Sequence, residues 1–168
     1  MRLTLYTDYA LRALIYLGLR QDRRVSIREI ATAHRISENH LVKVVHQLGR
    51  GGFVETTRGK GGGLRLARAP GQIRIGDVVR FTEEDMALVA CFQPTATGGG
   101  CALINACRLQ SLLGEALAGF MAVLDSRTLA DLLGPPHRQA MAARLGLAPA
   151  GGPVLPPPSP AELPPHDA

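Results

Sequence analysis

All three cysteines of this 168-residue chain lie in one glycine-rich segment, at Cys91, Cys101 and Cys107. Nine residues separate the first two and five separate the last two. Because no Cys-x2-Cys pair occurs, the spacing is a poor match to a structural zinc site. Three soft thiolates in one loop suit an iron–sulfur cluster in size and in ligand chemistry. At this point three unrelated cysteines remain the alternative interpretation.

As a cluster site, the segment lacks a fourth ligand. No histidine occurs between His46 and His137, and the chain has no further cysteine. The missing ligand would therefore be a carboxylate, a residue distant in the sequence or a residue of another subunit. A cluster with one weaker, replaceable ligand suits a sensor better than an electron carrier.

The segments that precede the cysteines have the pattern of a helix-turn-helix. Residues 7–20 are almost wholly apolar with helical periodicity. Ser26 to Glu29 is typical of a capping box that begins a second helix, which would end near His34. Ser37 can cap a third helix that runs to about Arg50. A short helix, a tight turn and a longer helix in this order predict a helix-turn-helix.

Two β-prone segments, residues 53–57 and 64–68, follow the third helix and flank a basic turn rich in glycine. Two strands joined in this way after a helix-turn-helix predict a winged helix. Residues 1–68 hold 13 basic and 5 acidic side chains, a net charge of +8, whereas residues 69–168 have a net charge of −3. The basic part indicates a polyanionic partner, most simply DNA, although a generally arginine-rich surface would also account for it.

The third predicted helix supplies the expected DNA-reading surface. Its apolar residues Leu41, Val44, Val45 and Leu48 share one face, which we expect to be buried. The remaining polar side chains can address base edges or phosphates in a major groove, and basic wing residues can reach a minor groove or the backbone. The alternative is a solvated helix face and a hairpin without a ligand. The expected DNA contacts are Asn39, His40, Lys43, His46, Gln47 and Arg50 of the helix, with Arg58 and Lys60 of the wing.

A long helix is predicted for residues 106–125, after a short helix at 73–81 and an acidic run at 83–85. Its apolar positions form a continuous stripe. Twenty residues span about 30 Å, which is longer than a small winged helix requires. We therefore expect part of the stripe to face a second subunit, the alternative being that it packs on its own domain. The stripe comprises Leu109, Leu112, Leu113, Ala116, Leu117, Phe120, Met121 and Leu124.

The predicted fold is mainly α, a winged helix-turn-helix DNA-binding domain with a long C-terminal dimerisation helix. No window approaches the length of a membrane span, and no secretory signal is evident, so we expect a cytoplasmic protein. Seven aromatic residues without tryptophan argue against an RNA-stacking platform, and no catalytic pair or phosphate loop indicates an enzyme. The predicted divisions are 1–82, the DNA-binding domain; 83–107, the acidic segment and cysteine loop; 108–134, the dimerisation helix and a short final helix; and 135–168, a proline-rich tail that we expect to be disordered, with a marginal helix at 136–147.

Together these residues resemble the IscR/NsrR family of iron–sulfur winged-helix transcriptional regulators, over about residues 1–133. The resemblance lies in MRLTLYTDYALRALIYL, ISENHLVKVVHQLGRGGFVETTRGKGGGLRLA, IRIGDVVR, TLADLL and the three cysteines. It is strongest to the nitric-oxide-sensitive branch, through TDYALRALIY and NHLVKVVHQL. The resemblance implies a homodimeric repressor that binds a double-stranded DNA operator and senses nitric oxide through an iron–sulfur cluster on the cysteines, [4Fe–4S] being favoured over [2Fe–2S].

The resemblance also implies the fourth ligand. In IscR-like members a histidine three residues after the last cysteine completes the cluster, and here that residue is Gln110. In nitric-oxide-sensitive members an aspartate early in the first helix of the partner subunit does so, and the matching residue is Asp8. A salt bridge from Asp8 to Arg12, or a favourable position at a helix N-terminus, is the local interpretation. The Cys91–Cys101 spacing exceeds the family's usual spacing, and the proline-rich tail is not part of the family pattern.

Two other functions remain open from the sequence. A regulator with the same architecture could report iron supply or oxidative stress instead of nitric oxide. A cluster-carrying redox or electron-transfer protein is the third possibility, and it would require no sequence-specific affinity for DNA.

Overall fold

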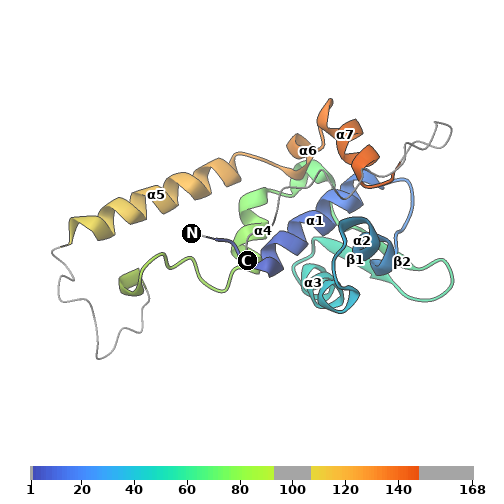
Figure 1. The fold of residues 1–168 in the computed structure, drawn as a ribbon, viewed down its shortest axis with the longest axis horizontal. Helices are drawn as coiled ribbons and strands as arrows, with labels where there is room; N and C mark the ends of the chain where they lie inside the picture. The colour runs from blue at the N-terminus through green and yellow to red at the C-terminus, as the bar shows by residue number, and fades with distance from the viewer. Residues whose placement is uncertain (1, 93–106, 148–168) are drawn as a thin grey trace, which may run out of the picture.

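The computed structural model describes residues 2–92 and 107–147 (Figure 1). Helices predominate in these ranges, and two short strands form an antiparallel hairpin, so the predicted mainly α, winged-helix fold is confirmed. None of the described helices combines the length and the apolar character that crossing a membrane requires. The elements are α1 (Leu5–Leu19), α2 (Ile27–His34), α3 (Glu38–Arg50), β1 (Val54–Thr57), β2 (Gly63–Leu66), η1 (Pro70–Gln72), α4 (Ile75–Thr82), η2 (Ala90–Phe92), α5 (Arg108–Asp125), α6 (Leu129–Leu132) and α7 (His137–Arg144).

Helix α1 is the centre of the core and contacts α2, α3, α4, α6 and β2. It begins two residues before the predicted start because the hydroxyl of Thr4 accepts a hydrogen bond from the backbone N–H of Thr7 and so caps the helix. Its small residues permit close approach by neighbours. At Gly18, for example, an added Cβ would collide with the side chain of Leu133.

The helix-turn-helix forms as the sequence predicts. In α2 the Ser26 hydroxyl accepts from the Glu29 N–H at 3.1 Å, and the Glu29 carboxylate accepts from the Ser26 N–H at 3.0 Å, which is the predicted capping box. The helix ends at Arg35, which adopts a left-handed conformation with a φ of 55°. Ser37 is the N-cap residue of α3, although its hydroxyl makes no capping hydrogen bond.

The wing pairs β1 with β2, from Val54 opposite Leu66 to Thr57 opposite Gly63. A bridge between Val25 and Leu64, with N···O distances of 3.0 and 2.8 Å, joins the hairpin to the segment before α2. Gly63 has a φ of +144°, and an added Cβ would lie 2.9 Å from the carbonyl oxygen of Val25. Glycine is therefore required where the wing joins the helices.

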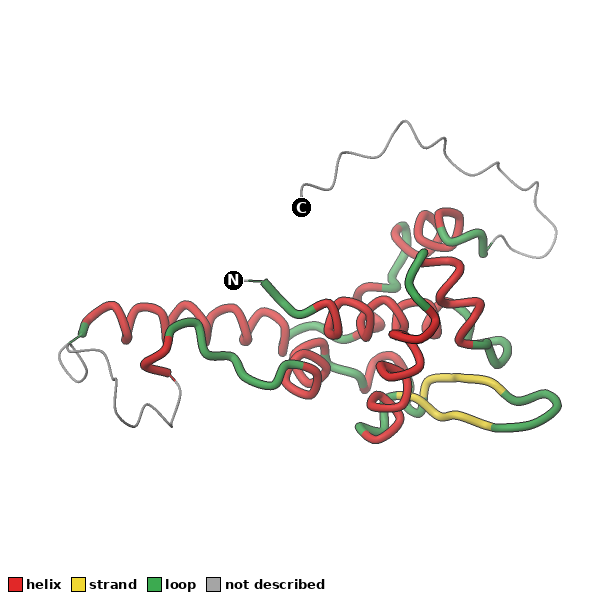
Figure 2. Tube along the Cα trace, turned by 60° about the horizontal axis from the view of Figure 1, so that its bottom comes forward, coloured by secondary structure: helices red, strands yellow, loops and turns green. Residues whose placement is uncertain are grey.

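Helix α5 projects from the body of the molecule, and η2 lies beside its outer part (Figures 1 and 2). At its inner end, Asp125 accepts a hydrogen bond from Arg80 of α4 at 2.8 Å. None of the 18 residues of α5 is buried within this chain. The predicted apolar stripe is present, but its own domain covers it only in part.

Helix α7 packs against α1 and α6 near the C-terminal end of α1 (Figure 1). Leu147, just beyond the helix, is 8% exposed and belongs to the hydrophobic core. The guanidinium of Arg138 donates hydrogen bonds to the carbonyl oxygens of Gly18 and Leu19 at 3.5 and 3.3 Å. It thereby satisfies carbonyls that the end of α1 leaves without helical partners. The tail expected to be disordered lies, beyond residue 147, outside the described residues.

Candidate nucleic-acid interface and cysteine segment

The exposed face of α3 lies opposite its four buried apolar residues, as predicted. Leu41, Val44, Val45 and Leu48 are at most 3% exposed. Because they fix the rotation of the helix, the opposite side is presented to solvent. Four of the predicted DNA contacts are exposed there: Asn39, Lys43, His46 and Arg50.

The other two predicted contacts on α3 lie towards α1. The His40 ring, although exposed, stacks on Tyr9 of α1 with a centroid distance of 6.5 Å and an interplanar angle of 25°. Gln47 is half-buried, and its side-chain oxygen accepts a hydrogen bond from Arg50 at 3.5 Å. Contacts within the protein therefore partly engage these two side chains, whereas Asn39 and His46 remain free to address a ligand.

Basic side chains at the base of the wing are paired with a carboxylate, whereas those in its turn are exposed. At its base the carboxylate of Glu55 accepts hydrogen bonds from Arg65 at 2.8 and 3.0 Å and from Arg24 at 3.1 Å. These hydrogen bonds, the Arg65 bonds foremost, lower the pKa of Glu55 below its ordinary value. Arg58 and Lys60, by contrast, are exposed in the turn between the strands. The predicted wing residues are thus the ones that the hairpin leaves available.

Six cations on α2, α3 and the wing have no carboxylate within 4.0 Å among the residues that the structure describes. Two of them, Arg28 on α2 and Arg35 at its end, were not among the predicted contacts. Their basic type and exposure on the first helix of the motif would have indicated them. When unpaired cations of a protein neutralise phosphates, the counterions condensed on the nucleic acid are released. This release drives nucleic-acid binding. The six are Arg28, Arg35, Lys43, Arg50, Arg58 and Lys60.

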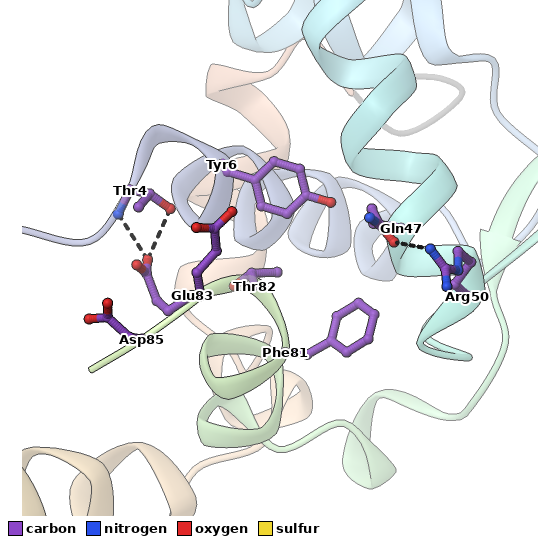
Figure 3. A pocket seen from close by; sticks show the side chains of 9 residues that line it. Thr4, Tyr6, Gln47, Arg50, Phe81, Thr82, Glu83 and Asp85 are labelled. Atoms are coloured by element: carbon purple, nitrogen blue, oxygen red, sulfur yellow. Dashed lines mark hydrogen bonds between the residues drawn. The ribbon is translucent and has the colours of Figure 1, made fainter. Parts of the chain in front are cut away.

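A cavity of about 710 Å³ separates the end of α3 from the start of α1 and the end of α4 (Figure 3). On one side it is lined by Gln47 and Arg50, and on the other by Glu83 and the acidic residues that follow. The hydroxyl of Tyr6 is buried there without a hydrogen-bond partner, and burial raises the pKa of this tyrosine. The end of the recognition helix and the start of the segment that leads to Cys91 therefore line the same cavity.

Paired hydrogen bonds join the start of α1 to the end of α4. The Glu83 carboxylate accepts from the N–H and the hydroxyl of Thr4, at 2.9 and 3.0 Å (Figure 3). Beneath it, the hydroxyl of Thr7 donates to that of Thr82 at 2.8 Å, and Thr82 in turn donates to the carbonyl of Val78 at 2.8 Å. Thr7 and Thr82 are 0% and 7% exposed. This buried pair fixes α1, which carries Asp8, against α4.

Two of the three predicted cluster ligands lie in the described ranges. Cys91 is in η2, Cys107 is the N-cap residue of α5, and both are half-buried free thiols. Gln110, in the first turn of α5, donates a hydrogen bond to the carbonyl oxygen of Cys91 at 3.5 Å. This contact brings the two ends of the cysteine segment together at the outer part of α5, while Cys101 lies outside the described residues.

The chemistry of the two described thiols suits an iron–sulfur cluster. No three histidine, cysteine or acidic side chains converge within residues 2–92 and 107–147. Two half-buried thiols flanking a third in sequence are nevertheless soft ligands of the kind that iron–sulfur clusters use. Gln110 occupies the place of the IscR-type histidine and uses its amide to hold Cys91. The two described thiols therefore fit part of the ligand set of an iron–sulfur cluster.

Asp8 forms the salt bridge that its local spacing predicts. Its carboxylate accepts hydrogen bonds from Arg12 at 2.9 and 2.8 Å, and its side chain is 39% exposed. α1 lies in the body of the molecule, whereas η2 and the start of α5 lie at the outer end of the arm in both views (Figures 1 and 2). Within one chain, Asp8 and the two described cysteines therefore belong to separate parts of the structure.

A winged helix-turn-helix with unpaired basic side chains on its recognition helix and wing defines a DNA-binding transcriptional regulator. Residues 3–135 match the Rrf2 family, described as an iron-dependent transcriptional regulator. The chain belongs to the Rrf2 family and, like its relatives, is a regulator of transcription and not an enzyme.

Named relatives are similar over most of the chain. The HTH-type transcriptional regulator NsrR of Geobacillus kaustophilus is 53% identical over 134 residues, which cover 79% of this chain and 90% of that protein. NsrR of Bacillus subtilis is 48% identical with the same coverage. The matches confirm the resemblance identified from the sequence.

Solved structures have the same fold. CymR of B. subtilis, titled the global cysteine regulator of that organism, has a TM-score of 0.66 and 26% identity over 79% of this chain and 95% of its own. IscR of T. potens has a TM-score of 0.62 and 27% identity over 79% and 86% of the two chains. Both likenesses support the winged-helix fold.

Proposed function

We propose that this protein is a cytoplasmic, homodimeric repressor that binds a double-stranded DNA operator and releases it in response to nitric oxide. An iron–sulfur cluster, [4Fe–4S] rather than [2Fe–2S], would be held by Cys91, Cys101 and Cys107 and completed by Asp8 of the partner subunit. The similarity to NsrR proteins supports this assignment. The observation that carries it is that η2, with Cys91, and the start of α5, with Cys107, lie on a projecting arm, away from α1, which carries Asp8 in its first turn.

The exposed side of α5 supports dimerisation. Leu109, Leu112 and Val123 are 57%, 60% and 63% exposed, although each is a large apolar side chain. A helix with an uncovered apolar stripe gains free energy when a second surface removes that stripe from water. A second copy of α5 provides such a surface, and the two-fold arrangement would bring each subunit's α1 towards the other's arm.

DNA binding would use two copies of α3 and the wing, one for each half-site. The contacts proposed are Asn39, His40, Lys43, His46, Gln47, Arg50, Arg58 and Lys60. Phosphate contacts by the unpaired cations would supply most of the affinity, and base contacts by α3 would supply specificity. The spacing between the two recognition helices must match that of the half-sites, so the subunit arrangement controls affinity.

When bound, the cluster would supply iron atoms with which nitric oxide can react. Asp8 of the partner subunit would be its weakest ligand, because this partly exposed carboxylate already has Arg12 as a partner in its own helix. Once Asp8 pairs only with Arg12, one link between the subunits is lost. The Thr7–Thr82 and Thr4–Glu83 contacts join the Asp8 turn to α4 and to the segment before Cys91.

The deciding experiment follows the absorption of the anaerobically purified protein and its operator binding during one titration with nitric oxide. We expect a [4Fe–4S] absorption band that decreases together with DNA affinity. Asp8→Ala should weaken cluster retention, whereas Asp22→Ala, an exposed acid outside the helices, should not. A colourless protein with bound zinc would refute the cluster. Unchanged cluster binding and nitric oxide response in Asp8→Ala would refute the intersubunit ligand.

A second candidate keeps the same architecture and changes the signal. The family description is iron-dependent, and IscR is among the similar structures. In this case an iron chelator, and not nitric oxide at low ratios to the protein, would abolish operator binding. Parallel titrations with the two reagents distinguish the candidates.

A further inference from the structure

One apolar side chain on α3 lies outside the core. Val42 is 46% exposed, whereas the other four aliphatic residues of the helix are almost completely buried. Among the described residues, the remaining exposed large apolar side chains are on other elements, namely α5, α6, the start of α1 and the end of α4. They are Leu5, Phe81, Leu109, Leu112, Val123 and Leu132. Val42 is therefore the exposed aliphatic group of the recognition helix.

The neighbours of Val42 place it within the proposed DNA-reading surface. On a helix, residues three and four apart lie side by side, so Val42 adjoins Asn39 before it and His46 after it, and both are exposed. His40 and Gln47 occupy the side of α3 that faces α1, away from Val42. The surface around Val42 thus faces solvent and not the core of its own subunit.

The charges on the two helices of the helix-turn-helix favour a nucleic acid over a protein as the covering partner. Arg28 of α2, Arg35 at the end of α2 and Lys43 of α3 have no carboxylate partner in the part of the chain that the structure describes. Unpaired cations on these helices are complementary to phosphates. Inside a major groove, the apolar group that an aliphatic side chain can contact is the 5-methyl group of thymine, which the other three bases lack.

We propose that Val42 is a specificity-determining residue that reads thymine, by packing its methyl groups against the 5-methyl group of a thymine in each half-site. This inference rests on the proposed function as a double-stranded DNA regulator. It adds an apolar contact to a set of expected contacts that is otherwise polar. Removing one buried methyl group corresponds to about a fourfold loss of affinity, from about 0.8 kcal/mol for each buried carbon. Losses in two half-sites multiply to more than about tenfold.

The test uses the full-length protein, purified anaerobically, and a duplex that it selects from a random-sequence DNA pool. Each thymine of the half-site is replaced in turn by deoxyuridine, which removes only the 5-methyl group and keeps base pairing. Wild type should lose about fourfold in affinity at one or two thymine positions. Val42→Ala should bind more weakly overall but lose nothing further at those positions, and Val42→Ile should keep the wild-type discrimination.

Leu132→Ala serves as the matched control, because it truncates another partly exposed aliphatic residue on an element distant from the recognition helix in sequence. It should respond to deoxyuridine as wild type does. If wild type selects no sequence from the pool, the proposed DNA-binding function itself fails. If wild type selects a sequence but wild type and Val42→Ala lose equally at every deoxyuridine, the DNA-binding function stands and thymine reading by Val42 is refuted.

Discussion

Substitution of Leu112 by serine should dissociate the proposed dimer. Leu112 is 60% exposed in the single subunit, and complete burial of a leucine side chain contributes about 1.5–3 kcal/mol. Covering the exposed part would therefore contribute about 1–2 kcal/mol in each subunit. Because a two-fold interface contains the residue twice, the variant should lose about 2–4 kcal/mol of association free energy. This loss raises the dimer dissociation constant by about 30-fold to several hundred-fold.

Sedimentation equilibrium over a range of protein concentrations measures this constant directly. The matched control is Ser111→Ala, an exposed residue one position before Leu112 and therefore about 100° around α5 from it. It should leave the dissociation constant close to that of wild type. Circular dichroism should show the same helix content in all three proteins, because α5 contributes no buried residue to its own subunit.

Operator binding provides a second measurement. A dimer that binds two half-sites should lose affinity in parallel with its association constant when Leu112 is replaced. If Leu112→Ser leaves the oligomeric state and the dissociation constant unchanged, the exposed side of α5 is not the subunit interface. The uncovered apolar area of α5 would then not mark the site of association.

Three further predictions concern stability. Thr82→Val leaves the fully buried hydroxyl of Thr7 without one of its hydrogen-bond partners. It should lower the free energy of unfolding, measured by urea denaturation, by about 1–3 kcal/mol. The Thr7→Val/Thr82→Val double variant should lose less than the sum of the two single losses, and additive losses would contradict a coupled pair. The hydrogen bond from Arg23 lowers the pKa of Glu29 from 4.5 to about 2. The stability that the ionised Glu29 carboxylate contributes is therefore complete above pH 4.5 and disappears as the pH falls towards 2. The melting temperature of Glu29→Gln should depend less on pH over that interval than that of wild type, whereas Glu115→Gln should behave as wild type does. A chain that ends at residue 135 lacks the contacts of Leu147 with the core and of Arg138 with α1. Its free energy of unfolding should be lower than that of the full chain by at least about 2 kcal/mol. An equal loss in a chain that ends at residue 148 would show that α7 is not responsible.

Several of these residues show why the site was only partly predictable. The capping box of α2 and the buried face of α3 depend on residues within a few positions of one another, so the sequence pattern contains them. The partnership of Thr7 with Thr82 joins residues 75 positions apart, and no local spacing indicates it. Val42 lies outside the apolar face that the sequence predicts for α3, but the expected DNA contacts are all polar side chains, so its apolar type did not indicate a contact.

The sequence by itself determined the order of helices and strands, the basic character of the DNA-binding part, the family and the grouping of the three cysteines. The family follows from the resemblance of the motifs, and the other features follow from periodicity, caps, turn residues and composition, which act over short stretches of chain. Tertiary structure alone decided that His40 and Gln47 turn towards α1, that α7 packs on α1 and that α5 leaves a large apolar side uncovered. The physical reason is that these features depend on which distant surfaces meet when the chain closes on itself, and burial is a property of the packed molecule.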